Sequence, residues 1–344
     1  MKTIIFFLLA FLLVITAECR AQQARIVFYN VENLFDTEDD PLTNDDEFLP
    51  NGPKRWTNER YYRKVVRIYQ VMAALGRGEL PAVIGVCEIE NREVLNRLVY
   101  DTPFHQFGYR FIHRDSPDRR GIDVALLYRP GLFSPDTAEW LEVPLGGGET
   151  TREILRVKGR LWDDHPIHFY VNHWPSRYGG AGSSRPKRVA AAATLAASVK
   201  RIYAVEDKPN IVIMGDFNDA PEDESMQIIS RIRTLSETSC PWPIVNLSTG
   251  YGLAGEGTLK HGGSWIVFDQ VLVSCAMIKG ENGLAILDRK TEIFKPDFLL
   301  EEDLIYTGVK PYRTYVGPAY HGGFSDHLPV SVTVGRLTGG GHRQ

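Results

Sequence analysis

The chain has 344 residues, of which 43% are hydrophobic and 24% are charged, and its formal net charge is −4. This composition is typical of a globular protein and excludes a disordered or fibrous chain. Because the chain is slightly acidic, any nucleic-acid binding would depend on a local basic surface and not on overall attraction.

The first 21 residues have the organisation of a secretory signal peptide. Lys2 precedes an apolar run, and small residues follow at Ala17 and Ala21. We expect cleavage after Ala21, with cleavage after Ala17 as the second choice. The apolar run is shorter than the roughly 20 residues that a membrane span requires. A lipid anchor on Cys19 is disfavoured because a charged residue, Glu18, directly precedes it. The mature protein is therefore predicted to be secreted or periplasmic, with no stable membrane anchor.

Residues 22–336 are predicted to form one domain, and the glycine-rich residues 337–344 a disordered tail. Three cysteines follow the signal peptide, at positions 87, 240 and 275, so at most one disulfide can form. Cys87 and Cys275 fall within predicted strands, which favours buried thiols. The disulfide state is otherwise left open, and a monomer without a protein partner is expected.

In the first half of the chain, apolar and β-branched runs predict strands, and helical spacing of apolar residues predicts helices. The expected strands are residues 25–30, 82–87, 109–113 and 122–128, and the expected helices are residues 57–75 and a segment through 94–98. The acidic segment 36–46 lacks periodicity and is predicted to be an exposed loop, with calcium binding as the alternative.

The second half continues in the same way. Strands are expected at residues 152–162, 168–171, 211–214, 265–273, 285–287 and 330–334, and helices at residues 186–202 and 224–232. The Gly- and Ser-rich residues 178–184 are expected to be a loop, and residues 240–263 to be irregular. Residues 288–323 are rich in Tyr, Pro and charge, which suits an insertion near a site.

Polar side chains gather where the predicted strands end or begin. They are Asn30, Glu88, His173, Asp216, Asn218, Asp269, Asp326 and His327. Carboxylates hold hard divalent cations, amides orient phosphoryl oxygens, and histidines transfer protons. The set therefore predicts metal-assisted phosphate chemistry. For Asp216 and Asn218, which follow one strand two residues apart, the alternative is a simple Asx-turn.

The order of these motifs is more specific than any one of them. Along the chain stand Asn-Val-Glu-Asn, Cys-Glu-Ile-Glu-Asn, Asn-His-Trp-Pro-Ser-Arg, Gly-Asp-Phe-Asn and Ser-Asp-His-Leu-Pro. In this series the sequence resembles the endonuclease/exonuclease/phosphatase superfamily, whose fold is deoxyribonuclease I-like. Within that superfamily it resembles a secreted member of the bacterial type. The resemblance runs from about Arg25 to Val334. It implies an α/β fold, namely a four-layer sandwich in which two mixed β-sheets pack face to face between helices.

The resemblance also implies roles for individual residues. Glu88 matches the principal metal-binding glutamate, with Asn30 and Asp326 as further groups at the metal. Asp216 and Asn218 match the pair that contacts the scissile phosphate, and Asp269 matches the aspartate that orients His327. The implied cofactor is a divalent metal, with Mg²⁺ preferred and Mn²⁺ or Ca²⁺ as alternatives.

His173 matches a histidine of the deoxyribonuclease I and sphingomyelinase branches that the apurinic-site endonuclease branch lacks. This match disfavours a DNA repair enzyme. For Asp123, which lies inside a predicted strand, we expect a hydrogen bond to His173. The alternative is a salt-bridged strand aspartate.

The predicted reaction is hydrolysis of a phosphoester by in-line attack of water, with Asp269 and His327 as general base or phosphate stabiliser. His173 is expected to protonate the leaving oxygen or to hold the phosphate. An endonuclease acting on nucleic acid is the first prediction. A phosphodiesterase or phosphatase acting on a lipid, sugar or small phosphoester is the second, and a non-catalytic binding module the third. Basic residues expected to meet the substrate are Arg120, Arg177 and Arg185.

Overall fold

The computed structural model describes residues 22–232, 242–288 and 290–337. The predicted signal peptide, Cys240 and all but the first residue of the predicted tail lie outside these ranges. Two β-sheets form the centre of the described chain. No helix among the described residues is long and apolar enough to cross a membrane.

The first sheet has seven strands. In order across the sheet they are β13 (Leu284–Ile286), β19 (Val330–Arg336), β1 (Gln23–Leu34), β2 (Val83–Ile89), β4 (Asp123–Tyr128) and β3 (Arg110–His113), with β14 (Glu292–Ile293) also paired to β19. Only β1 and β2 run parallel, and the other neighbours are antiparallel. The sheet is therefore mixed.

The second sheet has six strands. They are β5 (Phe133–Leu141), β6 (Ile154–Leu161), β7 (His165–His173), β8 (Ile211–Asp216), β12 (Asp269–Ser274) and β9 (Ile244–Asn246). Here only β7 and β8 are parallel. Each sheet thus contains one parallel pair of inner strands.

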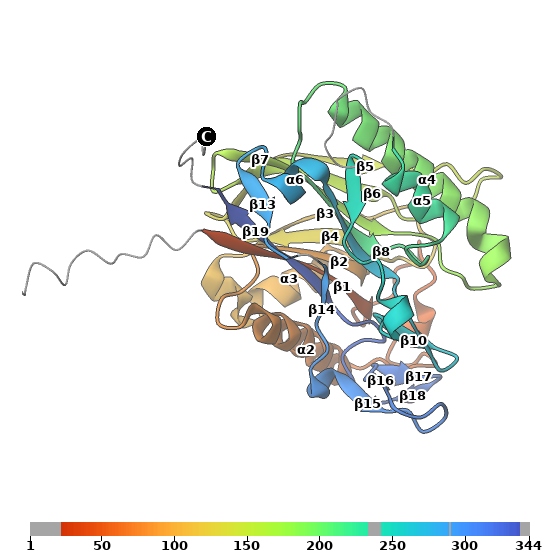
Figure 1. Cartoon of the computed structure of the whole chain (residues 1–344). Helices are drawn as coiled ribbons and strands as arrows, with labels where there is room; N and C mark the ends of the chain where they lie inside the picture. The colour runs from red at the N-terminus through yellow and green to blue at the C-terminus, as the bar shows by residue number, and fades with distance from the viewer. Residues whose placement is uncertain (1–21, 233–241, 289, 338–344) are drawn as a thin grey trace, which may run out of the picture.

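Helices cover the outer faces of both sheets, as Figure 1 shows. The helices α2 (Asn58–Gly76) and α3 (Arg92–Tyr100) lie on the side of the first sheet, and α4 (Ala181–Tyr203) and α5 (Glu224–Ser230) on the side of the second. Three apolar cores separate the layers, one under each pair of helices and one between the sheets. This arrangement confirms the four-layer α/β sandwich.

Smaller elements connect these layers. They are α6 (Cys275–Lys279), the 3₁₀ helices Asp46–Phe48, Pro103–Phe107, Gly252–Ala254 and Asp297–Leu299, and the hairpins β10 (Leu259–His261) with β11 (Ser264–Ile266), β15 (Leu300–Glu302) with β16 (Val309–Pro311), and β17 (Tyr315–Val316) with β18 (Ala319–Tyr320).

The structure departs from the sequence predictions at several elements. Strand β5 was not predicted, because it contains Pro135 and is largely exposed at a sheet edge, so it lacks the alternation of a half-buried strand. Strand β9 lies inside the segment expected to be irregular. The stretch 265–273 is divided between β11, which belongs to a hairpin, and β12.

Helix α4 begins at Ala181, inside the expected loop. The Ser183 and Ser184 hydroxyls donate to main-chain carbonyls in the preceding turn, and Pro186 lies near the start of the helix, where a missing N–H costs little.

The prediction for Cys275 was wrong. This cysteine lies at the start of α6 and not in a strand, and it is disulfide-bonded. Cys87 is a free, buried thiol, as expected.

Candidate active site

The two parallel strand pairs bring four predicted residues to one edge of the sandwich. Asn30 pairs in register with Cys87, next to Glu88. His173 pairs with Asp216 at the ends of β7 and β8. Because parallel strands end on the same side of a sheet, each pair delivers two functional side chains together.

Asn30 joins the two sheets. Its buried Nδ2 donates to Oε1 of Glu88 at 3.1 Å and to Oδ2 of Asp216 at 3.0 Å. Its Oδ1 accepts a hydrogen bond from the main-chain N–H of Glu32 at 2.9 Å. Asn30 therefore orients two carboxylates of the candidate metal site, and direct ligation by its amide oxygen remains a prediction.

The backbone around Glu88 is held in an unusual conformation. Glu88 has φ 62°, and Asn33, whose N–H donates to Glu88 Oε2 at 2.8 Å, has φ 53°. Non-glycine residues in the left-handed region are uncommon and mark positions where surrounding contacts override local preference. Both residues lie where the strand register between β1 and β2 shifts. The irregularity turns Glu88 toward the edge of the sheet.

Two histidines face Asp216 from different elements. The Nε2 atoms of His173 and His327 each lie 3.8 Å from Asp216 Oδ2. Nδ1 of His327 lies 2.7 Å from Asp269 Oδ2, which confirms the expected contact of this pair. Asp269 therefore fixes the ring so that Nε2 of His327 faces the site.

The surroundings shift the pKa values of the two histidines in opposite directions. Burial lowers the pKa of His173 well below its usual value, and the nearby positive charges of Arg152 and Arg120 lower it further. Burial also opposes protonation of His327, but Asp269 and Asp216 raise its pKa well above the usual value. The opposite shifts favour a neutral His173 beside a protonated His327, which suits opposite roles in proton transfer.

Asp216 and Asn218 form the Asx-turn of the alternative interpretation and also belong to the site. The N–H of Asn218 donates to Asp216 Oδ1 at 2.9 Å, and its Nδ2 donates to the carbonyl of Trp174 at 3.1 Å. Burial raises the pKa of Asp216 to about 7. The backbone turn and the functional position are compatible.

Asp326 has a partner that the sequence did not reveal. Nη2 of Arg313 lies 2.9 Å from Asp326 Oδ2, and its Nε lies 3.2 Å from Oε1 of the buried Glu32. Glu32 belongs to the Asn-Val-Glu-Asn motif, so the sequence did contain a signal that could have identified it. Arg313 lies in the segment 288–323, and its contact with Asp326 places this part of the segment near the candidate site, as expected.

A second group missed by the sequence analysis supports His173. The buried Arg152 donates from Nε to the carbonyl of His173 at 3.2 Å and from Nη2 to that of Trp174 at 2.8 Å. Its Nη1 lies 2.7 Å from Asp118 Oδ2, and Asp118 Oδ1 accepts the main-chain N–H of Arg120. Arg152 therefore positions both the histidine strand end and the loop that carries Arg120.

The pairing expected for Asp123 was wrong. Its Oδ2 lies 2.8 Å from Nε2 of His113, and its Oδ1 accepts the N–H of Ser116. Asp123 faces a neighbouring strand of its own sheet and not the parallel pair that carries His173. The alternative of a strand aspartate paired with a basic group describes it better.

The three predicted substrate arginines lie in different places. Arg120 and Arg177 line a pocket of about 580 Å³ together with six of the predicted site residues, whereas Arg185 does not. The Nε of Arg185 instead contacts Glu224 at 2.7 Å on the exposed surface. The pocket holds Glu88, His173, Asp216, Asn218, Asp326 and His327, with Tyr178, Leu259, Ile266 and Phe268 among its apolar walls.

The residues fit a divalent cation. Glu88 and Asp216 converge on Asn30, and Oδ1 of the buried Asp269 has no hydrogen-bond partner in the described chain. Ligand atoms of Asp216, Asp269 and His327 lie within 4.8 Å of one another. Buried carboxylates without sufficient positive partners are costly unless a cation compensates them. Glu88, with Asp216 and Asp326 lining the same pocket, would hold such an ion.

Candidate oxygen ligands, an orienting amide and two histidines with oppositely shifted pKa values are the parts expected of a metal-dependent phosphoester hydrolase. Comparison with family models gives the same class. The model of the endonuclease/exonuclease/phosphatase family matches residues 25–336, and the chain belongs to this family. The family uses divalent metals and acts on phosphoester substrates such as DNA.

Solved structures share the fold at low sequence identity. A family member from Bacteroides thetaiotaomicron is 14% identical with a TM-score of 0.57, and the alignment covers 94% of this chain and 99% of that one. A mannosyl-6-phosphatase from the same organism is 14% identical, with a TM-score of 0.55 and coverages of 90% and 99%. TDP2 from Caenorhabditis elegans is 15% identical, with a TM-score of 0.53 and coverages of 91% and 97%. A search of curated proteins gives no match.

Proposed function

We propose that the protein is a secreted, divalent-metal-dependent phosphoesterase whose substrate is a small phosphoester. The choice of substrate rests on the ion pairs that Arg177 makes. Its Nη2 lies 2.8 Å from Asp219 and 2.5 Å from Asp223, and its Nε donates to the carbonyl of Asn218. An arginine compensated by two carboxylates can still contact a single anion, but it adds little to the extended positive surface that the backbone of a polyanion requires.

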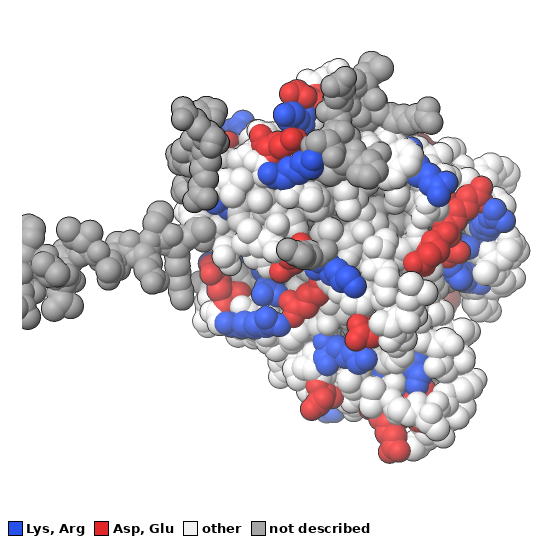
Figure 2. All heavy atoms as spheres, viewed as in Figure 1, with Lys and Arg blue, Asp and Glu red and all other residues white. Residues whose placement is uncertain are grey.

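Other basic residues around this loop are compensated in the same way. Lys187 lies 2.6 Å from Glu149, and the buried Arg188 lies 2.8 Å from Asp219. On the face that Figure 2 shows, acidic and basic side chains of the described residues are interspersed, and they form no extended basic area there. Nucleic-acid binding depends on such an area, because phosphate contacts supply most of the affinity. The pairing of Arg177, Lys187 and Arg188 with carboxylates therefore favours a small substrate.

Endonuclease activity, which was the first prediction from the sequence, is the second candidate. Tyr178 lines the active-site pocket and is 95% exposed, so its ring is available to stack on a base. A nuclease with this site would act on short or single-stranded segments that reach the pocket.

The proposed mechanism assigns one task to each group. Asn30 holds the Glu88 and Asp216 carboxylates in place, and the bound cation would neutralise charge that develops on the phosphoryl oxygens. Asn218 and the protonated Nε2 of His327 donate toward the phosphoryl group. The neutral His173 can accept a proton from the attacking water, and the leaving oxygen can take its proton from Nε2 of His327 as the ester bond breaks. Arg120 lies on the rim, where it can bind a non-reacting oxygen of the substrate.

A substrate panel tests the proposal. Purified protein is incubated with glycerol 3-phosphate, bis(p-nitrophenyl) phosphate, sphingomyelin, RNA and plasmid DNA, each with Mg²⁺ and with EDTA. We expect Mg²⁺-dependent hydrolysis of the small esters. Plasmid cleavage at a higher kcat/KM than any small ester would favour the endonuclease instead, and hydrolysis that EDTA leaves intact would contradict the metal-dependent mechanism.

Secretion is tested separately. N-terminal sequencing of the protein recovered from the medium or periplasm of expressing cells should begin at Gln22. A cytoplasmic protein that retains residues 1–21 would overturn this part of the proposal.

A further inference from the structure

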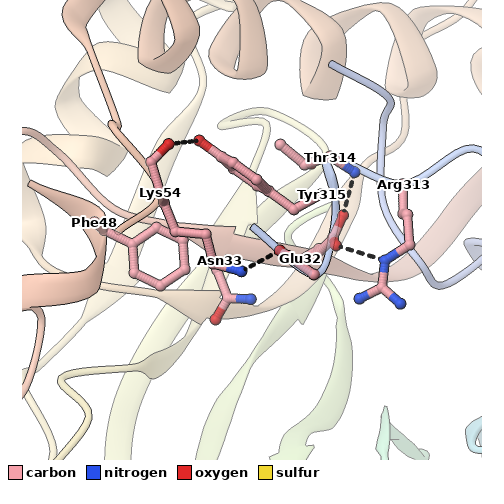
Figure 3. A pocket seen from close by; sticks show the side chains of 8 residues that line it. Glu32, Asn33, Phe48, Lys54, Arg313, Thr314 and Tyr315 are labelled. Carbon is pink, nitrogen blue, oxygen red and sulfur yellow. Dashed lines mark hydrogen bonds and ion pairs between the residues drawn. The ribbon is translucent and has the colours of Figure 1, made fainter. Parts of the chain in front are cut away.

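A second, smaller pocket lies beside the active site. It has a volume of about 240 Å³, and its walls include Glu32, Asn33, Phe48, Lys54, Arg313 and Tyr315. Figure 3 shows Lys54 and Asn33 on one side of Glu32 and Arg313 on the other. We call this cavity the side pocket. Drug-sized ligands occupy pockets of about 300 to 1,000 Å³, so the side pocket suits one chemical group and not a whole molecule.

Two walls of the side pocket are bonded directly to the catalytic carboxylates. Arg313 lies 2.9 Å from Asp326 through Nη2, and the main-chain N–H of Asn33 donates to Glu88 at 2.8 Å. A substrate whose phosphate sits at Glu88 and Asp326 would therefore have the side pocket as its immediate neighbour.

The side pocket presents cationic and amide donors. Lys54 lines the pocket, and its Nζ donates to the carbonyl of Gly317 at 2.9 Å. Nζ also lies 3.3 Å from Oε1 of Glu47, a half-exposed carboxylate that is not part of the pocket wall and that an incoming anion would have to displace or share. The side-chain amide of Asn33 makes no hydrogen bond to any described residue, and Nη1 of Arg313 likewise has no partner among them. An ammonium, a guanidinium and an amide that line one small cavity form a binding site for an oxyanion.

The acidic residue in the pocket wall does not oppose this use. Glu32 is 4% exposed, and its carboxylate accepts from Arg313 Nε at 3.2 Å and from the N–H of Thr314 at 2.7 Å. Lys64, which is also buried, lies 3.9 Å away. The negative charge of Glu32 is thus satisfied from inside the protein, and Glu32 acts as a support for Arg313.

The cation at the other wall is held in position before any ligand binds. Nζ of Lys54 lies 4.9 Å from the centre of the Tyr315 ring, and the Tyr315 hydroxyl donates to the Lys54 carbonyl at 3.0 Å. The Tyr315 ring packs against Trp56, which contacts Phe48 edge-on. Because this lysine has already lost much of its freedom, it would contribute more to binding than a mobile surface lysine.

We propose that the side pocket binds a second anionic group, a phosphate or a carboxylate, of the same substrate whose phosphoester is hydrolysed. The inference rests on the proposed action on small phosphoesters and specifies their class as doubly anionic. Arg313 would act as a specificity-determining residue that faces both groups. Lys54 would contact only the second one.

Matched substrates test the inference. 3-Phosphoglycerate and glycerol 3-phosphate differ by a carboxylate in place of a hydroxymethyl group, and fructose 1,6-bisphosphate and fructose 6-phosphate differ by a phosphate. We expect the doubly anionic member of at least one pair to have a KM about tenfold lower, the value of one charge-assisted contact. The pair that shows the preference identifies the anion as carboxylate or phosphate.

Variants locate the preference. Lys54→Met should reduce the KM ratio within the preferred pair to about one, and Lys54→Arg should retain it. The control is Lys290→Met, which removes another lysine that lies over a tyrosine ring but outside both pockets. A KM ratio that is unchanged in Lys54→Met, or that falls equally in Lys290→Met, would overturn the assignment.

A binding measurement separates this inference from the proposed function. Calorimetric titration of the same four compounds in Mg²⁺ should show about tenfold tighter binding of the doubly anionic member, and Lys54→Met should abolish the difference. Such a binding preference without turnover would reject the proposed substrate class but would still support the anion site in the side pocket. Equal affinities in both pairs, or no binding of either, would reject the anion site.

Discussion

Arg152 and Asp118 form a buried ion pair, with 2.7 Å between Nη1 and Oδ2 and side chains that are 4% and 8% exposed. The remaining guanidinium nitrogens donate to the carbonyls of His173 and Trp174. One charged side chain thus links the loop before β4 to the end of β7. Neither residue touches the reacting groups directly, yet both determine where His173 lies.

Replacement of Arg152 should therefore affect both stability and activity. Arg152→Met leaves Asp118 charged and buried without its partner, and we expect a loss of about 3–5 kcal/mol in the free energy of unfolding. Urea titration measures this change. The matched control is Arg185→Met, which removes an exposed ion pair with Glu224 and should cost about 1 kcal/mol or less. Similar losses in the two variants would contradict the structural role of Arg152.

The His327 and Asp269 pair is expected to be essential for turnover. His327→Ala removes a proton-transfer group and should lower kcat about 10²- to 10⁴-fold while the protein stays folded. Asp269→Asn should shift the pH–rate profile, because the carboxylate that raises the pKa of His327 is lost. His321→Ala, at an exposed histidine of the 288–323 segment, is the control. Wild-type turnover in His327→Ala would reject its assigned role.

Cation binding should depend on Glu88. Glu88→Gln keeps the shape of the side chain and its acceptor for the N–H of Asn33, but removes the charge. We expect Mg²⁺ affinity, measured by calorimetry, to fall on the order of 10- to 100-fold. EDTA should abolish wild-type activity and added Mg²⁺ restore it. Unchanged Mg²⁺ affinity in Glu88→Gln would place the cation elsewhere.

The pH dependence of stability should reveal Glu90. Burial raises the pKa of this carboxyl to about 8, well above the roughly 4.3 of an unfolded glutamate. Between these values the native state holds a proton that the unfolded state has lost, so stability decreases as pH rises from about 4 to about 8.

Glu90→Gln should remove this dependence and stabilise the protein at pH 9 by on the order of 2 kcal/mol. Near pH 4, where Glu90 is protonated in both states, the variant and wild type should be similar. Urea midpoints at pH 4, 6 and 9 give the comparison. If Glu90→Gln stabilised the protein more at pH 4 than at pH 9, the assigned direction of the pH dependence would be wrong.

Gly215 should be intolerant of a side chain. A Cβ at this position would lie 2.5 Å from Cβ of Asn172 on the neighbouring strand, whereas a Cβ at Gly182, inside α4, would meet no atom within 4 Å. We expect Gly215→Ala to destabilise the protein by about 1–3 kcal/mol and to displace Asp216. Gly182→Ala should stabilise it by about 0.5–1 kcal/mol. Thermal unfolding of the two variants decides between these opposite signs.

The sequence indicated which polar residues gather at one edge of the sandwich because their positions follow from local patterns. A β-branched run that ends in Glu88, His173 or Asp216 places a polar group at a strand end regardless of the rest of the fold. Arg152 and Arg313 could not be identified in this way, because their roles arise from contacts with residues far away in the sequence. The pairing of Asp123 was wrong for the same reason: strand order, which a single sequence does not specify, placed His113 beside it.

The hydrogen bond from Asn30 to Asp216 crosses from one sheet to the other, so the active site spans the seam between two halves of the molecule. Its dimensions are set by how closely the sheets approach, and at Gly85 an added Cβ would lie 2.8 Å from the end of Met214 on the facing sheet. The inter-sheet core therefore works as a spacer for the catalytic groups. Substitutions that thicken or thin it are expected to change turnover at temperatures where the protein is still fully folded.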